Sequence, residues 1–151
     1  MQVIEPKAHH VFDWVELAKE FAAEVIQNYG WGINEEDLHK TYHAWDKKDW
    51  GFLLEHEDRI VGVLAGAITP HFFDHSNLIF SEFMWYVQPE FRKTGGGLML
   101  YRALVERCKT KGVRRIVMGH TGYMINEFEC LYESLGFTYL QTHYEKVING
   151  N

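Results

Sequence analysis

Three consecutive glycines stand between an apolar run and a segment with helical periodicity, and this arrangement limits the folds open to the chain. The apolar run, residues 78–87, has the length and composition of a buried strand. After Gly95, Gly96 and Gly97, apolar residues recur at intervals of three and four as far as Cys108. Glycines let a backbone approach a ligand closely, and the start of a helix directs N–H groups and positive potential at the same place. The segment is therefore predicted to form a strand, an anion-binding loop and a helix in succession.

The spacing of apolar residues divides the rest of the chain into further elements. Two amphipathic helices precede a hairpin with the polar turn Glu57-Asp58, and Asn34 is placed to cap the second helix. Gly112 and Gly136 are expected to end the two later helices. The predicted elements are helices at residues 6–30 and 34–45, strands at 50–54, 59–68 and 78–87, a helix at 98–111, a strand at 113–118, a helix at 128–135 and a strand at 137–148. Crossover helices make strands parallel and hairpins make them antiparallel, so we expect an α/β (α+β) fold with a mixed sheet.

Length and charge restrict the class of protein. A chain of 151 residues is long enough for one domain, here residues 1–151, with a single core. The formal net charge of −6 opposes nucleic-acid binding and favours a cationic partner. No run approaches the roughly 20 apolar residues of a membrane span, and no secretory signal is apparent. Cys108 and Cys130 lie in predicted helices beside apolar residues, which favours buried thiols and a cytoplasmic location.

The glycine segment fits one known family better than the common nucleotide folds. It matches neither Gly-x-Gly-x-x-Gly nor a Walker loop. Instead, Arg92-x-x-Gly95-x-Gly97 resembles the pyrophosphate loop of the GNAT superfamily of N-acetyltransferases, Gln/Arg-x-x-Gly-x-Gly/Ala. Residues 85–91 resemble that family's strand and lead-in, and residues 132–137 resemble the end of its C-terminal helix. The resemblance covers about residues 78–137, while the earlier elements match the family in order only.

The resemblance implies a fold, a co-substrate and a set of contacts. The fold would be a mostly antiparallel sheet of six to seven strands with about four helices and a splayed parallel strand pair. A bulge within residues 83–87 would separate that strand from the strand at Ile116, admit the pantetheine arm and present backbone N–H groups to the acetyl oxygen. Acetyl-CoA would be the co-substrate, without a metal, and a homodimer is one assembly that the resemblance allows, since many members of the family dimerise. Its contacts would be Trp85, Tyr86, Val87, Arg92, Lys93, Thr94, Gly95, Gly96, Gly97, Leu98 and Asn126, although Asn126 stands six residues before Tyr132 where the family often has seven.

Catalytic candidates follow from the chemistry of amine acetylation, which needs a base and often an acid. Strict alternation along residues 78–87 places Phe80, Glu82, Met84 and Tyr86 on one face. Glu82 is the only charged residue in this run, and burial would raise its pKa toward the range of a general base. The alternative is a carboxylate at the sheet's rim or paired with Arg or His. His120 is a second candidate base, and Tyr132 matches the family's tyrosine that protonates the departing thiolate.

Two functions remain open at this stage. The first is an N-acetyltransferase that transfers acetyl from acetyl-CoA to a primary amine, on a small molecule or a peptide, by direct attack in a ternary complex. The second is a non-catalytic CoA-binding or protein-interaction module with a GNAT fold. His71 and His75 have metal-ligand spacing, but Pro70 and Ser76-Asn77 favour a loop over a metal site. An aromatic acceptor pocket is an alternative to plain core packing for Tyr29, Trp31, Trp45 and Trp50.

Overall fold

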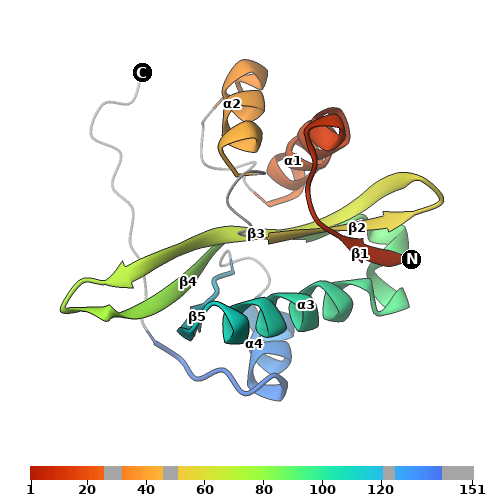
Figure 1. Ribbon diagram of the computed structural model, residues 1–151. Helices are drawn as coiled ribbons and strands as arrows, with labels where there is room; N and C mark the ends of the chain where they lie inside the picture. Colours follow the sequence, from red (N-terminus) through yellow and green to blue (C-terminus); the bar gives the residue numbers. More distant parts are fainter. Residues whose placement is uncertain (26–31, 46–50, 121–124, 141–151) are drawn as a thin grey trace, which may run out of the picture. The chain divides into compact units, whose positions relative to one another are not determined.

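The computed structural model describes residues 1–25, 32–45, 51–120 and 125–140 (Figure 1). They form two compact units, Met1–Gly119 and His120–Asn151, and each is described by itself. The first unit contains β1 (Gln2–Ile4), η1 (Ala8–His10), α1 (Val11–Val25), α2 (Glu35–Trp45), β2 (Gly51–His56), β3 (Arg59–His71), β4 (Asp74–Val87), η2 (Pro89–Thr94), α3 (Gly96–Thr110) and β5 (Val113–Val117). The second unit contains α4 (Ile125–Ser134). Within the described ranges, no helix is both long and apolar enough to span a membrane.

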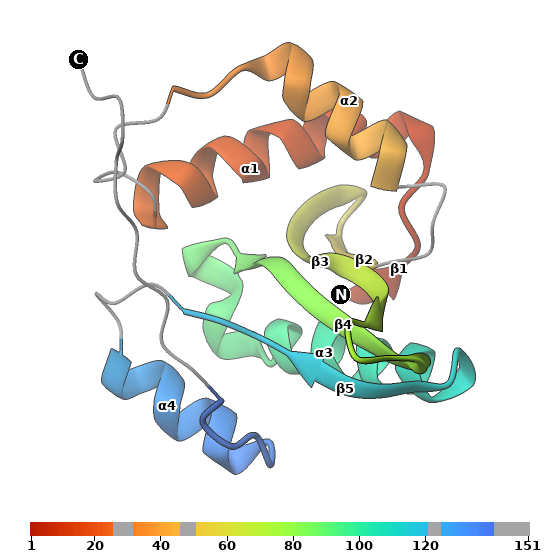
Figure 2. The same ribbon diagram turned by 90° about the vertical axis from the view of Figure 1, so that its left-hand side faces the viewer.

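The sheet of the first unit has the order β1-β2-β3-β4-β5. The first three pairings are antiparallel, and β4 pairs with β5 in parallel through the crossover helix α3. Helices α1 and α2 cover one face and α3 covers the other (Figures 1 and 2). The prediction of a mixed, mostly antiparallel sheet is therefore confirmed.

The strand count differs from the six to seven that the resemblance implied, because the described residues form five strands. β1 was not predicted, since a strand of three residues is too short to show a period. The expected strand at residues 137–148 is not seen in its described part, 137–140, and the remainder lies outside the described residues. The first helix begins at Val11 rather than near Pro6, because Lys7 is extended and a short 3₁₀ turn follows it.

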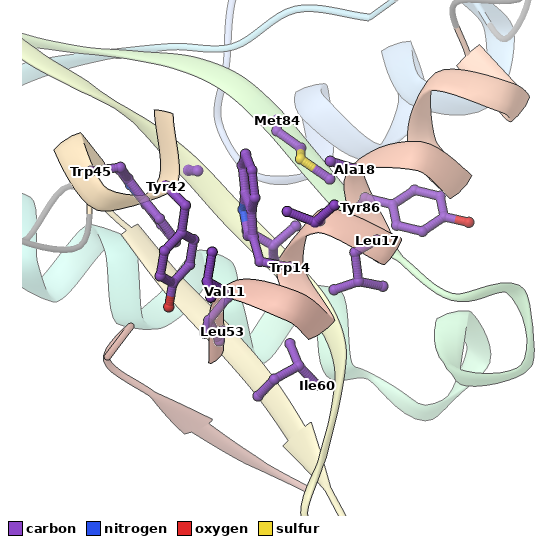
Figure 3. Packing of buried hydrophobic residues seen from close by; sticks show 13 residues of the cluster. Val11, Trp14, Leu17, Ala18, Tyr42, Trp45, Leu53, Ile60, Met84 and Tyr86 are labelled. Atoms are coloured by element: carbon purple, nitrogen blue, oxygen red, sulfur yellow. The ribbon is translucent and has the colours of Figure 1, made fainter. Parts of the chain in front are cut away.

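The sheet separates two clusters of buried side chains. On the α1 and α2 face, Trp14 packs with Tyr42 and Trp45, and Met84 and Tyr86 contribute from β4 (Figure 3). The cluster on the α3 face is formed by side chains from β2, β3, β4 and α3. Its buried members are Phe52, Leu54, Val61, Leu64, Phe80, Val87, Leu100, Leu104 and Cys108. Side chains from both faces of β4 thus enter the core, as its apolar run from Leu78 to Val87 predicted.

A β-bulge in β4 breaks the predicted alternation of side chains. Ala65 pairs with Met84 while the next residue, Gly66, pairs with Glu82, so Phe83 is an extra residue on β4. Phe80 consequently belongs to the α3 cluster, whereas Met84 belongs to the α1 cluster. The predicted common face of Phe80, Met84 and Tyr86 is wrong, because one inserted residue exchanges the two faces for the remainder of the strand.

Local signals in the sequence fix several boundaries as predicted. The Asn34 side chain accepts a hydrogen bond from the Asp37 N–H at 3.3 Å and caps α2. Glu57 and Asp58 have φ of 50° and 60° in the tight turn between β2 and β3. Gly112, with φ of 71°, follows α3. In the second unit, Gly136 has φ of 84° and ends α4 in a Schellman motif, in which the Phe137 N–H bonds the Tyr132 carbonyl at 2.9 Å.

Gly66 faces the bulge and has no room for a side chain. A Cβ at this position would lie 2.3 Å from the Ser81 carbonyl oxygen and 2.3 Å from the Phe80 ring. We therefore expect Gly66→Ala to lower the free energy of unfolding by about 1–3 kcal/mol, measured by urea denaturation. Gly32→Ala is the control, because a Cβ there meets nothing within 4 Å. Equal stability of the two variants would contradict this account of the bulge.

Candidate active site

The parallel strand pair separates immediately before the bulge. The ladder between β4 and β5 runs from Leu78 to Ser81 on β4 and ends at the pair Ser81 and Val117. From Glu82 onward β4 keeps its β3 partner, but no pairing with β5 is found in the described part of the chain. The bulge that the resemblance implied is confirmed and lies at Phe83. Backbone groups that β4 directs away from β3 in this stretch are therefore not used by a ladder with β5.

Glu82 bridges the two strands at the point where they separate. Its carboxylate accepts a hydrogen bond from the Gly119 N–H at 3.2 Å, two residues beyond the end of β5. Burial raises the pKa of Glu82 to about 7, and the hydrogen bond from Gly119 opposes this rise only in part. The side chain is partly accessible. A carboxyl group that titrates near neutral pH and can be reached from solvent meets the requirements of a general base.

The raised pKa of Glu82 has a consequence for stability. The folded protein binds the Glu82 proton more tightly than the unfolded chain, whose pKa is 4.5, so stability falls as pH rises from about 4.5 to about 7. Glu82→Gln removes this penalty. We expect the variant to be more stable than the wild type by about 3 kcal/mol at pH 8 and by less than about 1 kcal/mol at pH 5, measured by urea denaturation. A gain that is independent of pH would refute the assignment.

The glycine loop joins the end of β4 to α3. Gly95 has φ of 84°, a left-handed conformation that favours glycine, and it precedes the first residue of α3. Gly96 is buried, and a Cβ there would lie 2.4 Å from Leu54 Cδ2. Gly97 has neither constraint, because its Cβ would stand at an ordinary 3.7 Å from the Trp85 ring. Folding thus explains two of the three glycines, and close approach of a ligand gives a reason for the third.

Arg92 is tied to two other elements. Its Nε donates to the Val87 carbonyl at 2.9 Å, and its terminal nitrogens donate to the two carboxylate oxygens of Glu24, at 2.8 and 2.5 Å. The guanidinium also lies 5.4 Å from the centre of the Tyr86 ring. Glu24 could not be predicted from the sequence, because it is 68 residues from Arg92 and lies in a helix whose acidic residues resemble an ordinary solvated face.

The remaining predicted contacts of the first unit lie around this loop. Trp85 is half-buried and stacks on Tyr101 of α3 at 6.1 Å. Tyr86 is buried, with its hydroxyl 3.4 Å from Glu20. Lys93 and Thr94 are exposed in η2, and Leu98 is half-buried in the first turn of α3. The structure thus brings the bulge, the glycine loop and their flanking residues together at one end of β4.

Two catalytic candidates belong to the second unit. His120 is exposed, and its ring stacks on that of Tyr132 at 6.2 Å and 25°. Tyr132 is partly buried in α4 and also contacts Phe137, at 5.4 Å between ring centres. Asn126 lies in α4, and its side chain is outside the described residues. The second unit therefore places His120 beside Tyr132.

The predicted aromatic pocket and the segment between β3 and β4 can be compared with the structure. Trp45 is buried in the core, which supports plain packing, while Tyr29, Trp31 and Trp50 lie outside the described residues. Phe72 and Phe73 form an exposed tip between β3 and β4, which extend further than predicted, and the Phe73 N–H donates to His71.

The two cysteines differ in burial. Cys108 is buried, and burial raises the pKa of its thiol to about 11. The prediction that Cys130 is buried is wrong, because it is exposed on α4. Adjacent residues of a helix point in different directions, so apolar neighbours in the sequence did not determine the side chain's burial.

Comparison with known proteins is consistent with this geometry. The sequence matches the model of the acetyltransferase (GNAT) family over residues 12–137. No curated protein matches the chain. Since the family match covers most of the sequence, it establishes the family independently of any single relative.

Solved structures show the same fold at low sequence identity. An acetyltransferase from Trypanosoma brucei is 17% identical, with 97% of this chain and 99% of that chain covered and a TM-score of 0.71. An aminoglycoside 6′-N-acetyltransferase from Acinetobacter haemolyticus is 17% identical, with 99% of this chain and 100% of that chain covered and a TM-score of 0.74. An aminoglycoside N-acetyltransferase in complex with CoA, AAC(6')-Iy, is 15% identical, with 98% of this chain and 95% of that chain covered and a TM-score of 0.76. By its sequence and its fold, this chain belongs to the GNAT family of acetyltransferases.

Proposed function

We propose that the protein is an N-acetyltransferase that transfers acetyl from acetyl-CoA to a primary amine by direct attack in a ternary complex. The observation that carries this proposal is the position of Glu82. It precedes the bulge at Phe83, lies at the point where β4 and β5 separate, and has a pKa of about 7. The family match over residues 12–137 spans both units, which supports one catalytic domain over residues 1–151.

The residues around the glycine loop fit the diphosphate of CoA. The first turn of α3 leaves N–H groups without partners inside the helix, and the helix dipole adds positive potential there. Gly97 leaves open the volume that a Cβ would fill. Lys93 adds a full positive charge, and the half-buried Trp85 and Leu98 border the loop. In this proposal, backbone N–H groups from Thr94 to Leu98 hold the diphosphate, with Arg92 supporting them.

The catalytic steps assigned to the protein are proton transfers and orientation of the reactants. Acetyl-CoA would supply the activated thioester. The Glu82 carboxylate would take a proton from the acceptor's ammonium group, and backbone N–H groups of β4 near Trp85, Tyr86 and Val87 would stabilise the oxyanion. Tyr132 would protonate the departing thiolate, and Asn126 would contact CoA from α4. His120, which stacks on Tyr132, remains the alternative base.

The test is a turnover assay with acetyl-CoA and a panel of amines, in which free thiol is measured. The panel holds an aminoglycoside, a polyamine and a peptide with a free N-terminus, because solved neighbours include aminoglycoside acetyltransferases and the net charge of −6 favours cationic acceptors. Thiol release that depends on one of these amines supports the proposal. Tight CoA binding without turnover on any amine would favour the alternative, a non-catalytic CoA-binding module.

A cytoplasmic location is part of the same proposal. Cys108 and Cys130 are both free thiols, which favours a reducing compartment. Localisation of a fluorescent fusion in the native cell would test it.

A further inference from the structure

Arg92 of η2, the arginine that precedes the glycine loop, forms an ion pair with Glu24 of α1. Both terminal nitrogens of the guanidinium donate to the carboxylate, one to each oxygen. A carboxylate held in this way has the fork geometry in which arginine also binds a phosphate group. The Glu24 carboxylate thus occupies the N–H donors of Arg92 that a phosphate group could otherwise bind.

The contacts of Arg92 allow an exchange of partners. Its Nε is bound to the Val87 carbonyl at 2.9 Å, on the chain segment that leads into η2. The bond from Nε can persist while the two terminal nitrogens change partner, because an arginine has five N–H donors and this bond uses one. The Glu24 and Arg92 side chains are 34% and 38% exposed, so a displaced carboxylate would be rehydrated.

The energies favour the exchange. An exposed ion pair contributes little, a factor of roughly 1.4 to 5 in an equilibrium constant. The pKa of Glu24 is lowered because Arg92 donates to it, so the carboxylate is charged at neutral pH and opposes a second anion beside it. A diphosphate carries more negative charge than a single carboxylate and also gains the N–H groups of α3. A competing carboxylate therefore weakens diphosphate binding without preventing it.

We propose that Glu24 is an internal competitor of the CoA diphosphate: it holds the Arg92 guanidinium in the ligand-free protein and is displaced when CoA binds. The inference rests on the proposed function, since it presupposes CoA as the ligand. It assigns to α1, which contributes no residue to the glycine loop, a role in setting the affinity of the CoA site. CoA binding then releases α1 from its ion pair with η2.

The experiment measures the Kd of CoA by calorimetry for the full-length wild type, Glu24→Gln and Glu20→Gln. Glu20 is the matched control, because it lies one turn away on α1 and bonds the Gln88 amide at 3.0 and 3.1 Å and the Tyr86 hydroxyl at 3.4 Å. The described hydrogen bonds of Arg92 go to Glu24 and Val87 instead. Glu24→Gln is expected to bind CoA about three- to fivefold more tightly than the wild type. Glu20→Gln is expected to stay within roughly twofold of it.

A second variant distinguishes competition from a structural role. In an Arg92→Gln background, which keeps a residue type that the family loop allows, Glu24→Gln is expected to leave the Kd of CoA unchanged. Weaker binding by Glu24→Gln would show a structural tether, and equal tightening by Glu20→Gln would show a general charge effect; each outcome overturns the inference alone. If the folded wild type binds no CoA, the inference and the proposed function fail together.

Discussion

Glu82→Gln is expected to lower kcat/KM for amine acetylation by roughly 10²- to 10⁴-fold, the usual contribution of a general base. The amide is close in size and still accepts a hydrogen bond from Gly119, but it cannot take a proton at neutral pH. The Kd of CoA should change little, because the Glu82 side chain accepts its hydrogen bond from Gly119 rather than from the glycine loop. Steady-state kinetics on the best amine of the panel, with calorimetry for CoA, provide both values.

The pH profile identifies which group acts as base. Since burial raises the pKa of Glu82 to about 7, wild-type kcat/KM should rise with pH, with an inflection near pH 7, and level off about one pH unit above it as the carboxyl loses its proton. Glu82→Gln should lack this inflection, and His120→Gln should retain it. A profile that loses its inflection in His120→Gln instead would transfer the role to His120.

Gly97→Asp is expected to weaken CoA binding by at least about 30-fold, or roughly 2 kcal/mol, through repulsion between two anions in close contact. The same change should not harm the fold. Gly97 is the second residue of α3, where an acidic side chain stabilises the helix by about 0.3–1 kcal/mol. Calorimetry with CoA and thermal denaturation should therefore change in opposite directions, with weaker binding and an equal or higher Tm.

Gly97→Ala is the matched control for this prediction. The family loop allows alanine at the position, and a Cβ there makes an ordinary contact with Trp85. We expect the Kd of CoA to stay within about threefold of the wild type. If the aspartate variant bound CoA as well as the alanine variant, the diphosphate would not lie over the start of α3, and the assignment of the loop would be wrong.

Local signals in the sequence were sufficient for much of the fold. Asn34, the Glu57-Asp58 turn, Gly112 and Gly136 act within a few residues of themselves, so their effects can be predicted without knowledge of the tertiary structure. The order of strand, loop and helix around Gly95 follows in the same way. Glu82 could be selected because a charged residue in an apolar run is unusual whatever the fold.

Features that depend on distant partners could not be predicted from the residue pattern alone. The bulge at Phe83 was expected only from the family resemblance, because it is defined by the pairing of β4 with β3 and the nearly continuous apolar sequence of residues 78–87 gives no sign of an extra residue. The Glu24 and Arg92 pair joins residues 68 positions apart. β1 is held by its pairing with β2 rather than by its own composition. The positions of Phe80 and Met84 on opposite faces could be known only once the bulge was seen.

The bulge at Phe83 also determines where the chain can change length. Beyond it, Met84 and Tyr86 serve one hydrophobic layer and Trp85 and Val87 the other. Deleting one residue between positions 83 and 87 would shift the register of the strand on one side of the deletion. The large side chains on that side would then point into the wrong hydrophobic layer. The exposed tip at Phe72 and Phe73 lies outside both layers. Natural variation in length and engineered insertions should therefore accumulate at that tip and be excluded from the last five residues of β4.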